Sequence, residues 1–460
     1  MTYSEAVDYI FNIPKFNKRG KTYNENLMRV MDKMGNPHMA HPSIHIAGTN
    51  GKGSTAQFIK SILVSAGYNV GIFTSPHLVR VNERISVVEN GRERLISDDE
   101  FLDTFLDVKD VVDEETSLGN AHISFFEYVF AMAAVYFADK KLDFVIYETG
   151  LGGRLDATNI LMPRVCVITS IGLDHTMYLG DNIEDIAGEK AGIIKPGVPV
   201  VYGTGYSEAD KIIEAIADEK GANAINVAKT KYIINEFTDK TIDFSVSNRY
   251  YNYDNLKLRN GNALYQVDNA ILALHACDVL FGDSDMKKKV MADDVVKRGL
   301  LHFDWQGRME CYGSHLVLDG AHNPDAIERF TETIKALYGE RSISLLFSVS
   351  SDKDYKTMAR ILCRELTFKN LYVTTLQNER GIKSGAMADI FKEYIADSNT
   401  AVYADDNLTE LFEQAYSNAV EKNDILFCAG SLYLVGSIKE LVDKPGFIRK
   451  PAGGRVNDKF

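Results

Sequence analysis

A glycine-rich run near the N-terminus has the residue types of a phosphate-binding loop. It reads Gly48-Thr49-Asn50-Gly51-Lys52-Gly53-Ser54, after an apolar run and before a helical pattern. Glycines in this setting expose several backbone N–H groups at a helix N-terminus, where the helix dipole also suits a triphosphate. Lys52 can add a positive charge between the β- and γ-phosphates. The loop therefore predicts an enzyme that binds ATP.

The spacing of this loop differs from the standard phosphate loop G-x-x-x-x-G-K-[ST]. In the standard loop a hydroxyl residue follows the lysine directly, whereas here Gly53 separates Lys52 from Ser54. The variant leaves open whether Ser54 can ligate magnesium as the standard hydroxyl does. The alternative is a glycine-rich turn with no ligand, but the order of strand, lysine and helix favours a nucleotide.

Three polar residues follow successive predicted strands, at positions suited to a metal ion. Ser75, Glu148 and His175 lie beyond the apolar runs at residues 69–73, 144–147 and 165–169. Open α/β sheets bind ligands at the carboxyl ends of their strands. Magnesium prefers oxygen, so Ser75 and Glu148 are the expected ligands. His175 is by its chemistry equally suited to a hydrogen-bonded place in the core.

A second glycine-rich loop follows Glu148 almost directly. It reads Gly150-Leu151-Gly152-Gly153-Arg154-Leu155-Asp156-Ala157-Thr158-Asn159. The loop is too polar and too rich in glycine to be core, which indicates a functional loop. The alternative is a plain connection between two elements.

A parallel sheet must bring these residues together, and the sequence patterns predict one. A strand at residues 43–47, a helix at 55–66 and a strand at 69–73 follow one another in the order of a βαβ unit. The apolar runs at 144–147 and 165–169 are typical of strands buried on both faces. Residues 230–260 predict an antiparallel β segment, and residues 269–281 predict a helix.

A second α/β series begins near residue 305. Strands are expected at 315–318, 342–347, 370–374 and 425–428, with helices at 325–337, 355–364 and 431–441. We predict an α/β fold in which a mostly parallel, P-loop-type ATPase domain at residues 1–304 precedes a smaller Rossmann-like domain at 305–460. The tail at 444–460, rich in glycine, proline and charge, is expected to be partly disordered.

Length, charge and cysteine usage narrow the class of protein. A chain of 460 residues is too long for a single hydrophobic core, so more than one domain is expected. The net charge of -13 argues against a nucleic-acid partner. Five cysteines without a CxxC pair indicate a reducing compartment rather than disulfides or a zinc site. No signal-peptide pattern and no apolar run of about 18 residues occur, so we expect a cytoplasmic protein with no membrane partner.

In their order along the chain, these motifs resemble those of the folylpolyglutamate synthases and dihydrofolate synthases, members of the Mur ligase superfamily. The resemblance runs from Tyr3-Ser4-Glu5-Ala6 to Gly430-Ser431-Leu432-Tyr433. It is carried by the two glycine loops, Ser75-Pro76-His77-Leu78, Arg80-Val81-Asn82-Glu83-Arg84, residues 188–197, Gly307-Arg308 and Asp319-Gly320-Ala321-His322-Asn323-Pro324. It implies two domains with the active site in the cleft between them.

The resemblance also implies nucleotide and metal ligands. ATP-binding residues would be Thr49, Asn50, Gly51, Lys52, Gly53, Ser54, Asn269, Arg308 and Asp319. Ser75, Glu148 and His175 match the family's magnesium ligands, which favours the metal role for His175. Lys190 matches a lysine that the family carbamylates with CO2, and the anionic carbamate can help to hold a second Mg²⁺. Residue types alone would favour a helix-surface ion pair for Lys190. Family members usually have His where this chain has Tyr265.

The substrate pocket is implied by similarity at residues 24–27, 124–127 and 155–157. The substrate-binding candidates are Phe125, Phe126, Arg154, Leu155, Asp156, Ala157 and Ser431. A phenylalanine ring can stack on a flat heterocycle, and we expect only one of Phe125 and Phe126 to face the ligand. His322 joins Lys52 and Lys190 as a catalytic candidate, because His322 and Ser431 resemble residues near the incoming glutamate.

The implied reaction is ATP-dependent addition of L-glutamate to a folate, to dihydropteroate, or to both, through an acyl phosphate. All substrates are small molecules, and a monomer is expected. One alternative is another Mur-type amide ligase. The cell-wall members usually carry an extra N-terminal domain, and only about 40 residues precede the glycine loop. The other alternative is a P-loop ATPase switch that needs no acceptor.

Overall fold

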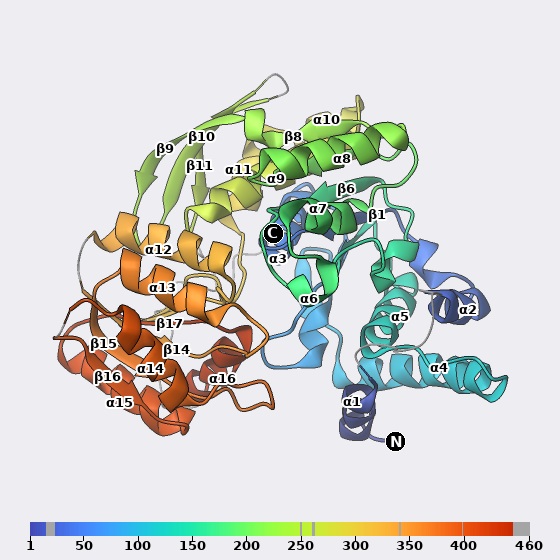
Figure 1. Ribbon diagram of the computed structural model, residues 1–460. Coiled ribbons are helices and arrows are strands. Elements are labelled where there is room, and N and C mark those ends of the chain that lie inside the picture. Colours follow the sequence, from blue (N-terminus) through green and yellow to red (C-terminus); the bar gives the residue numbers. More distant parts are fainter. Residues whose placement is uncertain (15–23, 249–250, 260–262, 340–341, 398, 445–460) are drawn as a thin grey trace. The chain divides into compact units, whose positions relative to one another are not determined.

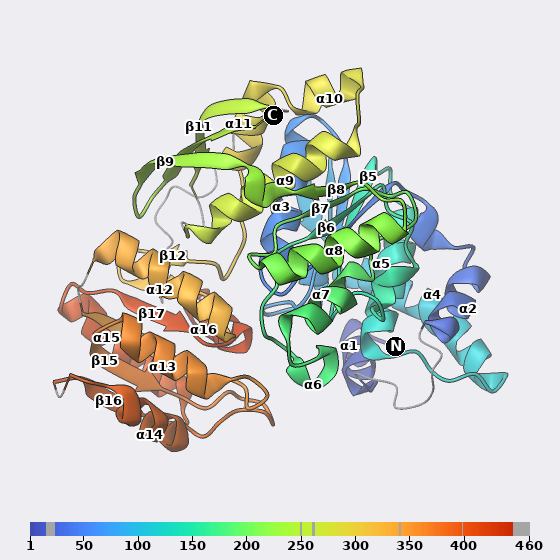
Figure 2. The same cartoon turned by 45° about the horizontal axis from the view of Figure 1, so that its top comes forward.

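The computed structural model describes residues 1–14, 24–248, 251–259, 263–339, 342–397 and 399–444. The chain folds into two compact units (Figures 1 and 2). Unit 1 comprises Met1–Gly172, Leu179–Lys231 and Asn269–Leu300, and unit 2 comprises Leu173–Tyr178, Tyr232–Asp268 and Leu301–Phe460. The functional division after residue 304 stays a prediction. The predicted loose tail lies outside the described residues, apart from Lys444.

An eight-stranded sheet forms the centre of unit 1, in the order β4-β3-β2-β5-β1-β6-β7-β8. The strands from β2 to β8 in this order pair in parallel, and β3 and β4 add an antiparallel edge. Every residue of β1, β2 and β6 is buried, as expected for strands covered on both faces. The strands are β1 (Ser43–Ala47), β2 (Val70–Phe73), β3 (Ile85–Glu89), β4 (Arg92–Leu95), β5 (Phe144–Glu148), β6 (Val165–Ile168), β7 (Val200–Tyr202) and β8 (Ala224–Asn226).

Helices cover this sheet with two apolar cores. One core joins α1, α2, α4 and α5 to β2, β3 and β5, and the other joins α7 and α8 to β1, β6 and β7. Helix α3 is buried at every residue from Ser54 to Leu63, so it is a core helix rather than a surface one. The α-helices up to residue 301 are α1 (Tyr3–Asn12), α2 (Glu25–Lys33), α3 (Lys52–Ser65), α4 (Asp98–Ser117), α5 (Phe125–Ala138), α6 (Thr176–Leu179), α7 (Ile183–Ala191), α8 (Ser207–Glu219), α9 (Tyr265–Leu280), α10 (Asp285–Val290) and α11 (Asp293–Leu301). Short 3-10 turns are η1 (Pro37–Met39), η2 (Val81–Arg84), η3 (Ala157–Ile160) and η4 (Val227–Lys229).

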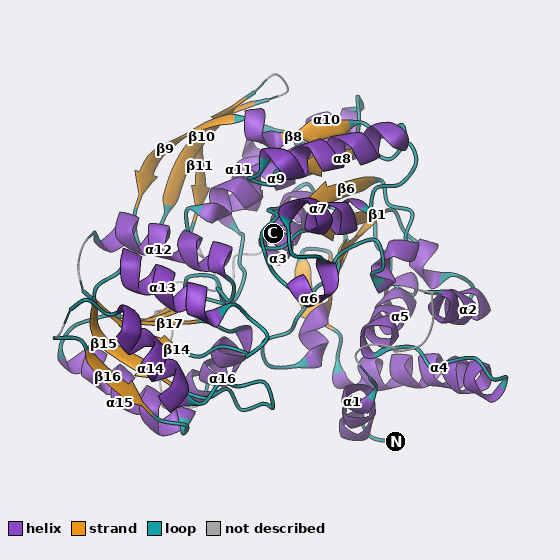
Figure 3. Ribbon diagram, viewed as in Figure 1, coloured by secondary structure: helices purple, strands orange, loops and turns teal. Residues whose placement is uncertain are grey.

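Unit 2 contains a six-stranded sheet in the order β12-β13-β17-β14-β15-β16, coloured orange among purple helices in Figure 3. All of its pairs are parallel except the edge pair β12–β13. The strands are β12 (Glu310–Tyr312), β13 (Leu316–Leu318), β14 (Ile343–Phe347), β15 (Phe368–Val373), β16 (Ala401–Ala404) and β17 (Leu426–Ala429). The helices are α12 (Pro324–Tyr338), α13 (Tyr355–Glu365), α14 (Ser384–Tyr394), α15 (Leu408–Glu421) and α16 (Leu432–Val442).

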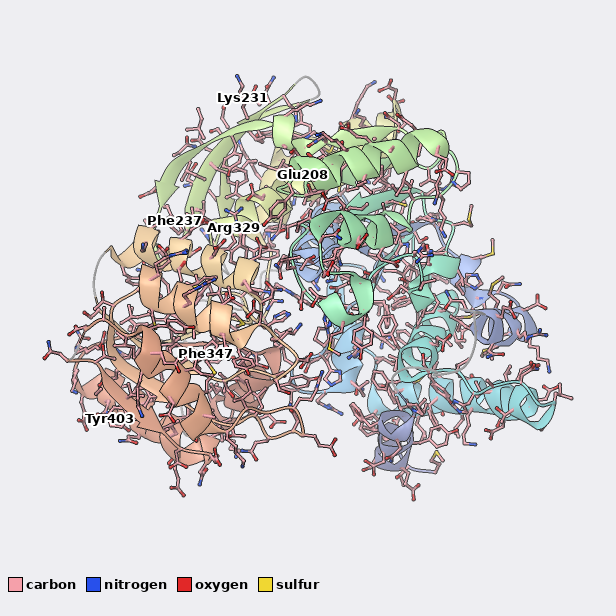
Figure 4. The ribbon with its side chains drawn as sticks, in the orientation of Figure 1. Glu208, Lys231, Phe237, Arg329, Phe347 and Tyr403 are labelled. Carbon is pink, nitrogen blue, oxygen red and sulfur yellow. The ribbon has the colours of Figure 1, made fainter. Side chains whose placement is uncertain are left out.

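A separate three-stranded sheet in unit 2 has the order β11-β10-β9. Its strands are β9 (Lys231–Phe237), β10 (Ile242–Ser247) and β11 (Asn252–Leu258), and Figure 4 labels the two end residues of β9. Its β10–β11 pair is antiparallel, as predicted for the segment at residues 230–260. None of the described helices is long and apolar enough to span a membrane.

The predicted α/β class with mostly parallel sheets is confirmed, but two predicted helix starts are wrong. Helix α3 begins at Lys52 rather than residue 55, because Gly51 serves as its N-cap. Helix α9 begins at Tyr265 rather than residue 269. Asp268 and Asn269 are residue types that often start helices, yet both lie within α9, so the residue types misplaced its start.

Candidate active site

The glycine loop connects β1 to α3 in unit 1. Gly51, the N-cap of α3, has a φ of 86°, in the left-handed region that favours glycine. The Nζ atom of Lys52 folds back over the loop and donates to the carbonyl oxygens of Gly48 (3.1 Å) and Thr49 (3.2 Å). A lysine held over a loop at the N-terminus of a buried helix is well placed for a phosphate group.

The loop is braced against the chain that follows β6. The Oγ1 atom of Thr49 donates to the carbonyl of Gly172 (3.1 Å) and accepts from its N–H (3.0 Å). The hydroxyl of Thr169 donates to the carbonyl of Asn50 (2.6 Å). A Cβ added at Gly48 would lie 1.8 Å from Thr169 Oγ1, so only glycine fits this position.

Asn269 lies against the glycine loop although it is distant in the sequence. Its Oδ1 accepts from the hydroxyl of Thr55 at 3.5 Å, and a Cβ added at Gly51 would lie only 2.3 Å from the same Oδ1. Ser54 is buried in the first turn of α3. The structure therefore brings the predicted loop residues and Asn269 together in unit 1.

Ser75 and Glu148 lie together at the carboxyl ends of the neighbouring parallel strands β2 and β5, with Ser75 two residues after β2 and Glu148 as the last residue of β5. The N–H of Ser75 donates to Glu148 Oε2 at 3.0 Å, and the Ser75 hydroxyl donates to the carbonyl of Thr149 at 3.4 Å. Glu148 is buried. A hydroxyl and a carboxylate side by side supply hard oxygen donors, which fit the preference of Mg²⁺.

Lys190 is buried near the end of α7 and is only 4% exposed. Its Nζ donates to the carbonyl of Gly48 at 2.7 Å, so Lys52 and Lys190 contact the same oxygen atom. This burial differs from the helix-surface position that the ion-pair alternative assumed.

The second glycine loop follows β5 and packs against α7. Arg154 is exposed and its Nη2 pairs with Glu189 Oε1 at 2.5 Å. Leu155 is exposed, Ala157 is buried, and the Asp156 carboxylate turns back into its own loop. The predicted pocket segments at 24–27 and 155–157 meet, because Asn24 Nδ2 donates to the carbonyl of Asp156 at 2.9 Å.

Phe125 and Phe126 form the first turn of α5. The preceding Ser124 and the later Glu127 cap each other's backbone N–H groups, as the pattern S-x-x-E predicts. The ring of Phe125 stacks with Phe11 at 5.6 Å. The ring of Phe126 covers Gly150, where an added Cβ would lie 2.7 Å away. Because Phe126 touches the second glycine loop, it is the better candidate for the stacking ring.

Asp319 organises the start of the second α/β series in unit 2. Its carboxylate accepts from Met309 N (2.9 Å), Ala321 N (2.8 Å) and the hydroxyl of Tyr265 (2.9 Å). Burial raises the pKa of Asp319, and the nearby Arg308 partly offsets this. Tyr265, which stands where the family usually has His, thus holds a predicted nucleotide contact.

His322 and Ser431 also lie in unit 2. His322 Nδ1 is 2.7 Å from the carbonyl of Gly320, which can only accept, so we assign the hydrogen to Nδ1. Burial lowers the pKa of His322 to about 4, so the ring is neutral at neutral pH and Nε2 has a lone pair. Ser431 is the N-cap of α16, and its hydroxyl accepts from Tyr433 N at 3.1 Å.

Sequence reasoning missed a buried ion pair in unit 2. Lys353 Nζ lies 2.6 Å from Asp174 Oδ1 and 3.4 Å from His175 Nε2, and Asn323 Nδ2 donates to Asp174 Oδ2 at 3.0 Å. Burial alone would raise the pKa of Asp174, but Lys353, then His322 and His175, hold it below its usual value. The charged run Asp352-Lys353-Asp354, shortly after β14, was the available signal.

The predicted magnesium ligands fall in both units. Ser75, Glu148 and Lys190 belong to unit 1, whereas His175 groups with unit 2. Over the described ranges of the chain, no three His, Cys, Asp or Glu side chains cluster as a metal site. The predicted set depends instead on a serine hydroxyl and on a lysine that becomes an oxygen donor when carbamylated.

Comparison with known families gives two matches along the chain. The Mur ligase middle domain matches residues 46–276, and the Mur ligase glutamate ligase domain matches residues 307–432.

Curated relatives match over most of their length. The dihydrofolate synthase/folylpolyglutamate synthase of Bacillus subtilis is 35% identical, covering 90% of this chain and 93% of the relative. The Escherichia coli protein of the same name is 31% identical, covering 86% of both chains. Among solved structures, the folylpolyglutamate synthase of Thermotoga maritima is 30% identical with a TM-score of 0.80, covering 97% of both chains. Escherichia coli FolC in complex with DHPP and ADP is 28% identical with a TM-score of 0.81, covering 96% of this chain and 98% of that one.

Proposed function

The chain belongs to the folylpolyglutamate synthase and dihydrofolate synthase family of Mur ligases, and from this premise we propose that it adds L-glutamate to a folate, to dihydropteroate, or to both. It is an ATP-dependent ligase. The observation that carries the proposal is the meeting of Lys52 and Lys190 at the Gly48 carbonyl. This contact puts two catalytic candidates beside the loop that is suited to hold the nucleotide.

The chemistry requires activation, because a carboxylate is a poor electrophile. Transfer of the γ-phosphoryl group of ATP to a carboxylate oxygen forms an acyl phosphate and ADP. The amine of glutamate then attacks the carbonyl carbon, the C–N bond forms, phosphate leaves and the nitrogen loses a proton. Lys52 lies over the glycine loop, where its charge can offset the negative charge of the phosphates.

Magnesium is the cofactor that fits the oxygen donors beside this loop. Ser75 and Glu148 would hold it, and a carbamylated Lys190 would add oxygen donors in the same unit. His175, in unit 2, stays a candidate ligand. The bound ions would neutralise phosphate charge during the transfer. The adjacent hydroxyl and carboxylate of Ser75 and Glu148 support this assignment.

Glutamate recognition is proposed for unit 2, the part of the chain that contains the matched glutamate ligase domain. His322 is neutral at neutral pH and its Nε2 lone pair can accept the proton that the amine loses. Ser431 would contact the incoming amino acid, and Arg308 and Asp319 would contact the nucleotide. Phe126, Arg154, Leu155 and Ala157 are the pocket candidates for the pteridine-bearing substrate.

A product assay tests the function directly. Purified protein is incubated with ATP, Mg²⁺, glutamate and either dihydropteroate or tetrahydrofolate, and products are identified by mass spectrometry. We expect an acceptor heavier by one glutamyl residue, with ADP and phosphate formed in equal amounts. Phosphate release that does not depend on acceptor and glutamate would favour the ATPase switch instead.

Two variants make this assay specific to the proposed site. Lys52→Ala removes the charge over the glycine loop and should abolish product formation. Lys211→Ala, an exposed position on α8, should leave the rate unchanged. We also propose a monomer in a reducing, cytoplasmic environment, which the five free cysteines support.

A further inference from the structure

Two buried residues that have no assigned role, His45 and Thr158, form a hydrogen-bonded chain with Asp156. His45 lies on β1 with no exposed surface, and its Nε2 is 2.7 Å from the hydroxyl of Thr158. The same hydroxyl is 2.5 Å from Asp156 Oδ1. These hydrogen bonds therefore connect β1, inside the unit 1 sheet, to the second glycine loop.

The chemistry of the three groups fixes the direction of each hydrogen bond. The Thr158 hydroxyl has one hydrogen, which goes to Asp156 because both carboxylate oxygens also accept from backbone N–H groups. Burial raises the pKa of Asp156, and these hydrogen bonds partly offset the shift. The hydroxyl oxygen must then accept from His45, so we assign the hydrogen of the imidazole to Nε2. Burial, and to a smaller degree Lys195, lowers the pKa of His45 to about 3, so the ring is neutral and carries one hydrogen.

Asp156 uses its carboxylate to shape the loop. Oδ2 accepts from the N–H groups of Gly150 (2.8 Å) and Leu151 (2.9 Å), and Oδ1 accepts from Thr158 N (3.0 Å) besides the hydroxyl. The loop begins at Gly150, two residues after Glu148. The carboxylate thus fixes the turn that directly follows a predicted magnesium ligand.

The other side of the same loop packs on the helix that carries Lys190. A Cβ added at Gly153 would lie 2.8 Å from the carbonyl oxygens of both Glu189 and Lys190. The N–H of Arg154 donates to the Glu189 carbonyl at 2.7 Å. A displacement of this loop would therefore shift the backbone next to both Glu148 and Lys190.

We propose that His45 and Thr158 are positioning residues that hold Asp156 and, through it, set the second glycine loop between Glu148 and Lys190. The Nδ1 atom of His45 is buried without a hydrogen-bond partner among the described residues, so the imidazole depends on the Thr158 hydroxyl, and its loss would leave buried polar atoms of both His45 and Asp156 less well paired. The catalytic consequence rests on the proposed ligase function, whereas the effect on the loop does not.

Thr158→Val tests the proposal with a nearly isosteric change. It removes the donor to Asp156 and the acceptor for His45, whereas Thr158→Ser keeps both. Hydrogen exchange of the Gly150 and Leu151 amides, read by NMR, should accelerate roughly tenfold or more in Thr158→Val, because their acceptor loses a hydrogen bond that orients it. Exchange in Thr158→Ser should match the parent.

Kinetics provide the readout that a merely structural role would not change. In Thr158→Val we expect kcat for amide formation to fall roughly ten- to a hundredfold, since small displacements of reacting groups have effects of this size. The KM for ATP should stay within about twofold, because the Lys52 loop is braced by other contacts. Thr158→Ser should recover most of kcat.

The outcomes separate the two proposals. Equal exchange rates in Thr158→Val and Thr158→Ser, or equal kcat values for the two, would overturn the positioning role. A parent protein that makes no glutamylated product would overturn the ligase function, and amide exchange would still decide the role of Thr158. If Thr158→Val does not fold, His45→Leu against His45→Gln, which keeps an N–H donor, provides the same comparison.

Discussion

Lys190 illustrates at the scale of a single residue how surroundings limit a side chain's chemistry. An ammonium group that is only 4% exposed has lost most of its contact with water, and its Nζ is bound to a backbone carbonyl. Carbamylation by CO2 would replace the ammonium group with an anionic oxygen donor. The contact is compatible with the carbamate that we propose.

Replacement of Lys190 tests this assignment. We predict that Lys190→Ala lowers kcat at least roughly a hundredfold, the scale of losing a positioned charged group at a reaction centre, while the fold is kept. Turnover and circular dichroism are measured beside the exposed Lys211→Ala control. Turnover within a few-fold of the parent would contradict the carbamate role. The parent should also lose activity in bicarbonate-free buffer and regain it when bicarbonate is restored.

At the scale of elements, the contact between the second glycine loop and α7 depends on the absence of one side chain. Gly153 has no room for a Cβ against the carbonyls of Glu189 and Lys190. Its backbone is not in the left-handed region, so the constraint is space rather than conformation.

We predict that Gly153→Ala lowers kcat roughly tenfold or more, because the loop or α7 must shift to admit the methyl group. Gly385→Ala is the matched control. It lies in the first turn of α14 with nothing within 4 Å, so the same change should be neutral or slightly stabilising. An unchanged kcat in Gly153→Ala would show that the contact does not position Lys190.

Helix α4 begins with a charged cap that makes its stability depend on pH. Glu100 caps the N–H of Ser97 and pairs with Arg94 (2.6 Å) and Lys140 (3.0 Å). Burial opposes ionisation, but Arg94, then Ser97 and Lys140, lower the pKa of Glu100 from 4.5 to about 2. Because the pKa of Glu100 is lower in the folded protein, this stabilisation is fully present above pH 4.5. It is lost as the pH falls towards 2.

Glu100→Gln keeps a capping side chain and removes its charge. We expect the free energy of unfolding at neutral pH to fall by about 0.5–1 kcal/mol, the usual range for partly exposed ion pairs. The melting temperature should fall with it. This difference from the parent should shrink as the pH falls from 4.5 towards about 2. Glu208→Gln, exposed on α8 and labelled in Figure 4, is the control. A difference that stays constant with pH would contradict the role of the charge.

At the scale of the whole molecule, the chain passes from unit 1 to unit 2 for the last time at residues 300–301. Trp305, the single tryptophan of the sequence, follows this junction and precedes Arg308 by three residues. The segment between Phe303 and Met309 therefore carries its own fluorescent probe.

We predict that a nucleotide with Mg²⁺ changes the Trp305 emission, because Arg308 is a proposed nucleotide contact. Arg308→Gln should weaken nucleotide binding roughly tenfold or more, the cost of one hydrogen bond to a charged group, and should abolish the change in emission. Arg364→Gln, on α13, should behave as the parent does, and Trp305→Phe should remove the signal. A full response in Arg308→Gln would exclude this contact.

Local sequence determined much of the fold. The strand at Ser43–Ala47 was predicted at its true bounds, and the glycine loop after it lies where a βαβ unit requires it. The capping signature Ser124-Phe125-Phe126-Glu127 starts α5 as its pattern indicates. These features depend on backbone conformation and on neighbours within a few residues, so they can be read from a short stretch of chain.

Only the tertiary structure decided which distant residues meet. Asn269 touches Gly51, His45 pairs with Thr158, and Lys353 pairs with Asp174. Residues 173–178 and 232–268 also belong to unit 2, although both segments precede residue 304. Such pairings follow from the order of strands in a sheet and from the packing of buried side chains, which depend on the whole folded chain. For this reason the residue types indicated the chemistry, whereas the buried chain that positions Asp156 became visible only in three dimensions.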